Sequence, residues 1–372
     1  MIILCIGMQA SGSTWVFNVV RSISNKYGKK SISFFCEEAK DFVDYVDIVD
    51  GFLIVKCHHV DDKFIKLLSM MDSKAIVTTR DPRDCVVSQL ERFSSRIIDV
   101  AGDLSRSLSS ISMLLNSIDV LPLSYENKPF DDVQTVKNIA HFMGVSLTEE
   151  DCQSIFDSMQ PDVIKKNIEE FKDNIDNNLW FDPETHWHPN HVGDGATGKW
   201  EQRLPEPYRD SLTQAFMPDS TLFQWPAQEI LWDANMFYYY DDRVAPLSRE
   251  VVCNGNEQCL IWGPYFHLPA GHWTIEFLIE PLDPYTAPVV KIDILSSGQG
   301  QGMIELRSVN LAADERTKLS VDIENFNHLS RIEARVHSTG DGRSGRFRFN
   351  GIRIRSRGGR GLRDSGRAAL VQ

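Results

Sequence analysis

Eight residues near the start of the chain, Gly7-Met8-Gln9-Ala10-Ser11-Gly12-Ser13-Thr14, constrain the fold more than any other segment. They have the spacing G-x-x-x-x-G-x-[ST] of a phosphate-binding loop. A continuous apolar run, Ile2 to Ile6, precedes them, and apolar residues at helical spacing follow from Ser13 to Lys26. The segment therefore predicts a strand buried on both faces, then a tight turn, then a helix whose N-terminus faces an anion.

Strand and helix patterns alternate through the first half of the chain. Further strands are expected at residues 52–56, 75–79 and 120–124, and further helices at residues 63–71, from about residue 83, and at 131–143. Strands separated by helices predict an α/β fold of P-loop type, a parallel sheet with helices on both faces. Ligands of such sheets bind at the carboxyl ends of the strands, where the polar motifs of this chain fall.

After about Trp225 the pattern changes to short alternating strands, for example Trp273, Ile275, Phe277 and Ile279. Such strands, with turn residues between them, predict a C-terminal all-β sandwich. We expect a first domain over residues 1–225, a sandwich over 226–355, and a disordered tail rich in arginine and glycine over 356–372.

Ser13 stands where a nucleotide triphosphatase has its phosphate-binding lysine. This substitution argues against an ATPase or a kinase and favours a ligand with a single phosphate in the loop. Two readings remain open from the residues alone. The segment binds a phosphate, or it is a serine- and glycine-rich turn that only caps the helix.

Two motifs resemble the signatures of one family. Ser11-Gly12-Ser13-Thr14-Trp15 resembles the loop that holds the 5'-phosphosulfate in sulfotransferases that use 3'-phosphoadenosine 5'-phosphosulfate (PAPS). The run from Arg80 to Ser88, RDPRDCVVS, resembles the segment that binds the 3'-phosphate. The resemblance covers about residues 1–220. It implies transfer of a sulfuryl group from PAPS to an acceptor hydroxyl, without a metal. It implies cofactor-binding roles for Gln9, Ala10, Ser11, Gly12, Ser13, Thr14, Trp15, Arg80, Ser88, Tyr125, Gly198, Lys199 and Trp200.

The second motif has a physical rationale of its own. Arg80 ends a predicted strand, Asp81 suits a helix N-cap, and Pro82 suits the first helical position. Ser88 then lies about two turns into the helix. A guanidinium fork and a hydroxyl fit a terminal phosphate, although an arginine that only caps a helix is the plainer alternative.

Lys56-Cys57-His58 ends the strand between these two motifs. Residues two apart on a strand share one face, so Lys56 and His58 are expected to face one site. By the family resemblance, His58 is the general base and Lys56 stabilises charge on the transferred or leaving group. His59 is expected to point elsewhere.

Gly195-Ala196-Thr197-Gly198-Lys199-Trp200 resembles the family's late segment that folds over the nucleotide, and Tyr125 matches a tyrosine near the adenine. The sequence also departs from the family pattern. Ala10 replaces the usual loop lysine, and Gly193-Asp194 replaces an arginine–lysine pair. His191, Lys199 and Arg203 are the candidate substitutes for the missing clamp.

The second domain carries a weaker resemblance. The stretch from Leu260 to Tyr265, and Leu268 to Gly271 after it, is similar to β-sandwich modules attached to bacterial sugar-modifying enzymes. Trp262 and Tyr265 are candidates to stack on sugars, whereas Trp273 is expected in the core. The resemblance implies a carbohydrate or glycoconjugate acceptor.

Charge and cysteine usage limit the partners. A net charge of -13 disfavours nucleic acid, and no stretch approaches the length of a membrane span. Seven scattered cysteines suit reduced thiols in the cytoplasm. His186, His188 and His191 have no carboxylate or cysteine spacing beside them, so no metal is expected. The alternative functions are a non-catalytic glycan-binding protein on a degenerate sulfotransferase fold and a small-molecule kinase.

Overall fold

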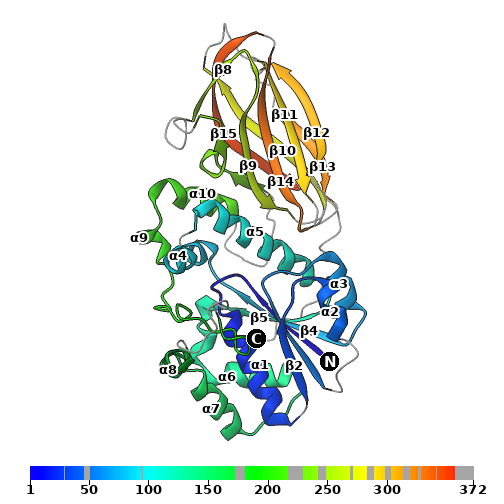
Figure 1. Ribbon diagram of the computed structural model, residues 1–372, viewed down its shortest axis with the longest axis vertical. Helices are drawn as coiled ribbons and strands as arrows, with labels where there is room; N and C mark the ends of the chain where they lie inside the picture. Colours follow the sequence, from blue (N-terminus) through cyan, green and yellow to red (C-terminus); the bar gives the residue numbers. More distant parts are fainter. Residues whose placement is uncertain are drawn as a thin grey trace. The chain divides into compact units, whose positions relative to one another are not determined.

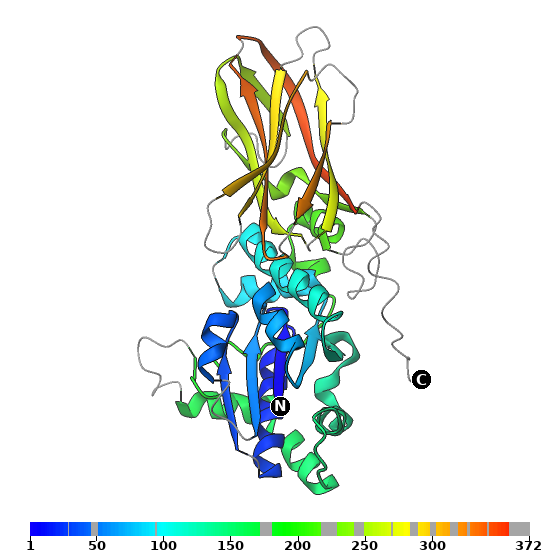
Figure 2. The same cartoon turned by 90° about the vertical axis from the view of Figure 1, so that its right-hand side faces the viewer.

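The computed structural model describes residues 1–28, 30–45, 51–93, 95–171, 181–216, 229–241, 249–268, 271–282, 289–297, 303–312, 319–325, 328–340 and 342–356 (Figure 1, Figure 2). The chain divides into two compact units. The first holds Met1–Ser95 and Met113–Lys199, and the second holds Arg96–Ser112 and Trp200–Gln372. The predicted tail falls outside the described residues from 357 onward, and the predicted domain boundaries stay predictions.

A five-stranded parallel sheet forms the first unit. Its order is β2 (Ser31–Phe35), β3 (Phe52–Cys57), β1 (Ile2–Gly7), β4 (Ser73–Thr79) and β5 (Asp119–Ser124). Every residue of β1 and β3 is buried, as the continuous apolar runs predict for central strands. The carboxyl ends of β1, β3 and β4 therefore lie side by side at one edge of the sheet.

Helices cover both faces of this sheet, which confirms the predicted fold class (Figure 1). Buried side chains of α1 (Ser13–Tyr27), α6 (Val133–Phe142), α7 (Glu149–Ser158) and α8 (Pro161–Phe171) form one apolar cluster with Ile3, Cys5 and Ile54. The opposite face carries α2 (Ala39–Phe42) and α3 (Asp62–Ser69). The next helix, α4 (Pro82–Arg92), begins directly after β4.

The second unit contains two antiparallel sheets. One has the order β13 (Leu319–Asn325), β10 (Gly271–Pro281), β15 (Ser344–Ser356) and β6 (Glu229–Trp232), with β8 (Glu250–Asn254) also on β15. The other has the order β12 (Met303–Ala312), β11 (Val289–Ser297), β14 (Arg331–Thr339), β9 (Glu257–His267) and β7 (Tyr238–Tyr239). The all-β prediction is confirmed, and Trp273 is 3% exposed, as expected for a core residue.

Three helices also belong to the second unit: α5 (Ile97–Leu114) over residues 97–112, α9 (Trp200–Arg203) and α10 (Glu206–Phe216). The α5 helix carries buried serines that permit close packing. The Oγ of Ser105 accepts a hydrogen bond from the backbone of His267 at 3.1 Å, and the Oγ of Ser109 donates to the carbonyl of His328 at 2.8 Å. No described helix has both the length and the apolar character needed to span a membrane.

Candidate active site

Gly7 and Gly12 shape the loop between β1 and α1. A Cβ at Gly7 would lie 1.8 Å from the Oγ1 of Thr78 on the adjacent strand. Gly12 has a φ of 93°, and a Cβ there would lie 2.3 Å from the Cζ of Phe130. The loop backbone can therefore lie this close to Thr78 and Phe130 only because positions 7 and 12 are glycine. The loop turns tightly into α1, whose first N–H groups have no partner within the helix.

The three hydroxyl groups of the loop differ in their surroundings. The Oγ of Ser11 is buried, lying 2.7 Å from the carbonyl of Met8 and 2.7 Å from the Oγ1 of Thr78. This hydroxyl ties the loop to β4. The hydroxyls of Ser13 and Thr14, in the first turn of α1, have no hydrogen-bond partner within the described part of the chain. They are the two donors that a ligand can use.

Trp15 anchors the start of α1 rather than facing solvent. Its side chain is buried, and its Nε1 donates to the carbonyl of Met159 at 3.1 Å. Its ring meets Phe130 edge to face, with the centroids 5.1 Å apart. Gln9 and Ala10 are half-buried in the loop, and Ala10 has a φ of 63°.

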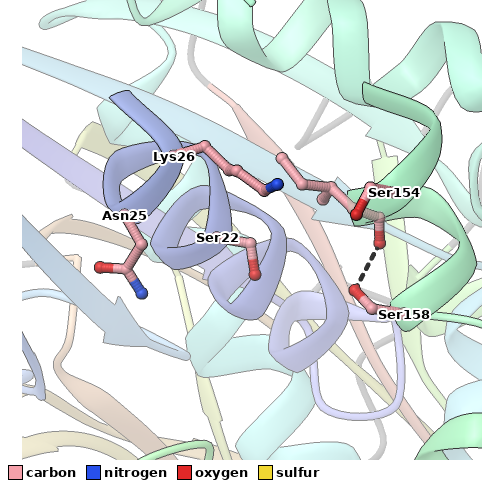
Figure 3. A pocket seen from close by; sticks show the side chains of 6 residues that line it. Ser22, Asn25, Lys26, Ser154 and Ser158 are labelled. Carbon is pink, nitrogen blue, oxygen red and sulfur yellow. Dashed lines mark hydrogen bonds between the residues drawn. The ribbon is translucent and has the colours of Figure 1, made fainter. Parts of the chain in front are cut away.

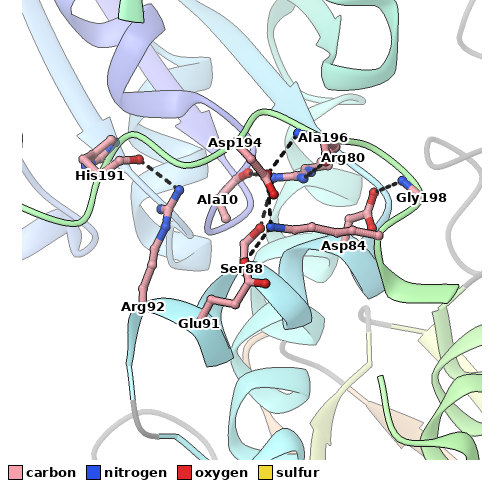
Figure 4. Close-up of polar contacts among 11 residues, drawn as sticks. Ala10, Arg80, Asp84, Ser88, Glu91, Arg92, His191, Asp194, Ala196 and Gly198 are labelled. Carbon is pink, nitrogen blue, oxygen red and sulfur yellow. Dashed lines mark hydrogen bonds and ion pairs between the residues drawn. The ribbon is translucent and has the colours of Figure 1, made fainter. Parts of the chain in front are cut away.

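Arg80 joins three segments that are far apart in the sequence (Figure 4). Its Nη1 donates to the carbonyl of Ala10 at 3.0 Å and to the Oγ of Ser88 at 3.3 Å. Its Nη2 donates to the carbonyl of Ala196 at 2.7 Å. The guanidinium also lies over the ring of Tyr125, 4.2 Å from its centroid. The loop, the second motif, Tyr125 and the late segment thus meet at one buried arginine.

The late segment is held by carboxylates of α4 (Figure 4). The backbone N–H of Gly198 donates to the buried Asp84 at 2.6 Å. The Nζ of Lys199 lies 2.8 Å from Glu91 and 3.6 Å from Asp194, so its charge is already paired. Trp200 begins α9 in the second unit.

The end of β3 places a histidine against the phosphate loop. The Nδ1 of His58 lies 2.8 Å from the carbonyl oxygen of Gly7, and its Nε2 lies 3.5 Å from the Nζ of Lys56. A carbonyl only accepts, so Nδ1 carries the proton and Nε2 keeps its lone pair. The Nε2 of His59 instead lies 3.1 Å from Glu37, and the same glutamate accepts the backbone N–H of His58 at 3.2 Å.

Burial sets the protonation states of this pair. Burial lowers the pKa of Lys56 to about 8. Burial, and then the charge of Lys56, lower the pKa of His58 to about 3. At neutral pH the pair therefore consists of a neutral imidazole beside an ammonium that loses its proton more easily than an exposed lysine does.

His186, His188 and His191 bring further imidazoles to this region. The ring of His186 packs against Phe17 and Phe181, with centroid distances of 5.2 and 5.4 Å. Burial, and then the charge of Lys56, lower the pKa of His186 to about 4. Among the described residues, no group of three or more His, Cys, Asp or Glu side chains is placed to hold a metal ion.

The sequence pattern of one domain family matches most of the first unit. The model of the sulfotransferase domain covers residues 2–224, which is more than half of the chain. The chain belongs to the sulfotransferase domain family. No curated protein sequence matches this sulfotransferase.

Solved structures show weaker likenesses. Mouse sulfotransferase SULT7A1 complexed with PAP has 17% identity and a TM-score of 0.42, over 60% of this chain and 86% of that one. Retinol dehydratase with retinol and PAP has 16% identity and a TM-score of 0.41, over 57% and 79%. TmCBM61 with β-1,4-galactotriose has 15% identity and a TM-score of 0.20, over 39% and 92%. TM-scores this low carry no weight, and family membership rests on the sequence match.

Arg92 is a cation of this sulfotransferase that the motifs do not reveal. It ends α4, and its Nη2 donates to the carbonyl of His191 at 3.0 Å (Figure 4). Burial, and then the charge of Arg80, lower its pKa, so the two guanidinium groups repel each other. The only signal in the sequence is the spacing of four between Ser88 and Arg92, which puts both on one helix face.

Several buried polar atoms around this edge of the sheet have no hydrogen-bond partner among the residues that the structure describes: Thr79 Oγ1, Arg80 Nε, His186 Nε2, His188 Nδ1 and His191 Nδ1. Unpaired buried polar atoms are costly and few in native proteins. One of these atoms belongs to Arg80 and three are histidine nitrogens, and His188 and His191 feel the charge of Arg92. An anionic ligand with several acceptor oxygens fits this set.

A separate pocket between α1 and α7 lies away from these groups (Figure 3). It is lined by Ser22, Asn25, Lys26, Ser154, Ile155 and Ser158. Lys26 is in the last turn of α1, whereas the phosphate loop precedes the first turn, and Lys26 pairs with Asp151 at 3.3 Å. We assign this pocket no part in the chemistry.

Proposed function

We propose that this sulfotransferase moves a sulfuryl group from PAPS to an acceptor hydroxyl, and that the acceptor is a carbohydrate. The contact between His58 and Gly7 carries the proposal, because it joins a proton acceptor to the first residue of an anion-binding loop at 2.8 Å. Transfer to a hydroxyl needs a base and a fixed anion site held in one geometry.

The donor fits the residues present. Arg80, Ser88 and Arg92 would hold the 3'-phosphate, because in the described part of the chain the two arginines donate to carbonyl and hydroxyl oxygens and to no carboxylate. The first N–H groups of α1 and the hydroxyls of Ser13 and Thr14 would hold the 5' side. When bound, PAPS would supply an activated sulfuryl group, and 3'-phosphoadenosine 5'-phosphate (PAP) would be the leaving group.

His58 serves as the general base in this proposal. Its Nε2 would take the proton of the acceptor hydroxyl, while Nδ1–H stays bonded to the carbonyl of Gly7. That carbonyl fixes the tautomer and stabilises the imidazolium as it forms. A neutral imidazole is present throughout the physiological range, because burial keeps the pKa of His58 at about 3.

Lys56 supplies the positive charge that the loop lacks at Ala10. Its Nζ is 3.5 Å from the Nε2 of His58 and lies over the ring of Phe35, 5.3 Å from the centroid. A fixed cation in a desolvated site stabilises charge on equatorial oxygens far more than it would in water. Lys199 is a weaker candidate, because Glu91 and Asp194 already pair with it.

Two observations support a carbohydrate acceptor. Phe35 and Phe181 are 44% and 36% exposed, and both lie near the histidines of the site, so they offer apolar surface to a ring-shaped acceptor. The second unit carries half-exposed Trp262 and Tyr265, and a glycan held there raises the local concentration of hydroxyl groups.

A reducing compartment is consistent with the cysteines. All seven are free thiols, and Cys253 and Cys259 do not bridge β8 and β9. A cytoplasmic location, where thiols stay reduced, remains part of this proposal.

A non-catalytic binding protein is the competing function, favoured by Ala10 and by the paired charge of Lys199. One experiment separates the two. The protein is incubated with PAPS labelled in its sulfuryl group and with a panel of glycans, phenols and peptides. Our proposal predicts label on a glycan. Tight PAP binding with no transfer to any class would favour the binding protein, and binding of ATP with Mg²⁺ in preference to PAPS would favour a kinase.

A further inference from the structure

One face of the sheet β12-β11-β14-β9-β7 combines aromatic and charged side chains. On β11 and β14, the side chains of Ile292, Ile294, Ala334 and Val336 are at most 1% exposed and fill the sandwich core. Their neighbours along each strand point to the opposite face, because side chains alternate along a strand. These neighbours are Lys291, Asp293, Glu333, Arg335 and His337.

Three aromatic rings from β7 and β9 share this face. Tyr238 pairs with Trp262 in the strand register, and their rings are nearly parallel, at 15° and with centroids 6.1 Å apart. The ring of Tyr265 lies 6.0 Å from that of Tyr238. All three are half-buried, unlike Trp273 in the core. They form a platform that a flat ligand can cover.

A buried carboxylate fixes the cations beside this platform. Asp293 is 1% exposed and accepts two hydrogen bonds from Arg335, at 2.6 Å from Nε and 2.8 Å from Nη2. Arg335 pairs with Trp262 in the register of β14 and β9. Neither its Nη1 nor the indole N–H of Trp262 has a partner among the described residues. Two donors are thus held rigidly beside the rings.

Positive charge exceeds negative charge on this face. The Nε2 of His337 lies 3.2 Å from Asp293, and that contact raises the pKa of His337 to about 9, so the ring is charged at neutral pH. Lys291 stands opposite His337 in the register of β11 and β14. Lys291, Arg335 and His337 share this face with Asp293 and Glu333, in a chain whose net charge is -13. Beside Tyr238 there is one further cation, Arg96, 5.6 Å from the ring centroid, and one further carboxylate, Asp99, 3.5 Å from the hydroxyl.

We propose that this face, with Trp262, Tyr238 and Arg335 at its centre, binds an acidic glycan whose sugars carry sulfate or carboxylate groups. The rings would take the C–H face of a sugar, and the free nitrogen of Arg335 would take the acidic group. Glu333 accepts the Tyr265 hydroxyl at 2.8 Å, and its carboxylate suits sugar hydroxyls better than a phosphate backbone. The site goes beyond the proposed sulfuryl transfer and does not depend on it.

The test measures binding of the full-length protein by calorimetry to four probes. These are a heparin-derived oligosaccharide, an oligogalacturonate, a neutral galacto-oligosaccharide and a single-stranded DNA oligonucleotide. We expect one of the two acidic glycans to bind at least about tenfold more tightly than the neutral one. The sulfated and carboxylated probes tell the two acidic groups apart.

Two variants localise the site. Trp262→Ala and Arg335→Lys should each weaken glycan binding roughly tenfold or more, as expected for central aromatic and arginine contacts. Arg353→Lys is the matched control, because Arg353 lies in the other sheet and likewise pairs with a carboxylate, that of Glu276, at 3.1 Å. Thermal melting shows that each variant is folded.

Four results would overturn the proposal: no glycan binding, equal binding of neutral and acidic glycans, tighter binding of DNA, or unchanged glycan binding by Trp262→Ala. None of them bears on sulfuryl transfer, which is measured separately with labelled PAPS. A protein that transfers label but fails these tests would retain the proposed sulfuryl transfer, and would lose this site together with the support that Trp262 and Tyr265 give to a carbohydrate acceptor.

Discussion

The Nδ1 of His58, at the end of β3, lies 2.8 Å from the carbonyl oxygen of Gly7, at the end of β1. This contact exists because β1 and β3 are adjacent parallel strands whose carboxyl ends meet at one edge. The carbonyl can only accept, so the tautomer of His58 is fixed by the same residue that begins the phosphate loop. A base and an anion site are thus coupled through one backbone atom.

The rate should depend on pH through Lys56. His58 must be neutral and Lys56 protonated, and their pKa values lie near 3 and 8. We expect kcat/KM to be level through neutral pH and to fall as pH rises above about 8, where Lys56 loses its proton. Arginine stays charged at that pH, so Lys56→Arg should remove the alkaline fall. The same fall in Lys56→Arg would show that another group titrates.

Lys56 should also compensate for Ala10. Lys56→Met removes the charge but keeps the volume, and the rate should drop on the order of 10²–10³-fold, as when a preorganised charge is removed from a transferring group. Ala10→Lys in that background should recover part of the loss. A rate unchanged by Lys56→Met in an active enzyme would contradict this role.

Donor binding should require both Arg80 and Arg92. Loss of a charged hydrogen-bond partner costs about 1.5–3 kcal/mol, so Arg80→Ala and Arg92→Ala should each remove most of the melting shift that PAP produces. Arg83→Ala is the control. The guanidinium of Arg83 already pairs with the carboxylate of Asp81 at 2.6 Å, so we expect its loss to leave the melting shift unchanged. If Arg92→Ala keeps the full shift, the 3'-phosphate site does not include it.

Gly12 should tolerate alanine less well than Gly28. Both glycines have left-handed backbone, with φ of 93° and 75°, which costs alanine about 1 kcal/mol. A Cβ at Gly28 meets nothing within 4 Å, whereas at Gly12 it meets Phe130. Urea unfolding should therefore show a larger loss of stability for Gly12→Ala, and Phe130→Leu should relieve part of it. Equal losses would mean that Phe130 moves aside at little cost.

Much of the fold follows from local patterns in the sequence. Continuous apolar runs identify β1 and β3 as central strands, and alternation identifies β10 and β13 in the sandwich. The edge strand β2, Ser31–Phe35, is half-buried and carries no such run. The serine-rich half of α5 joins the second unit through contacts across more than 150 residues, as between Ser105 and His267, which no local pattern encodes.

The site was only partly predictable for the same reason. Motif spacing predicts Arg80, Lys56 and His58, which lie at the ends of neighbouring strands, and Ser88, which lies on α4 beside Arg80. Motif spacing does not show that the hydroxyl of Ser11 is already hydrogen-bonded to Thr78, because this contact depends on the register of β1 and β4. Nor does it reveal Arg92, whose role depends on the fold of the loop that carries His191.

The role of His58 is tested by the rate of label transfer from PAPS to a glycan by the wild type and by His58→Ala, at equal PAPS occupancy. A general base contributes roughly 10²–10⁴-fold, so we predict a loss of that size with PAPS affinity unchanged, and near-normal transfer by His59→Gln. Transfer by His58→Ala within a few-fold of the wild type would contradict the central claim.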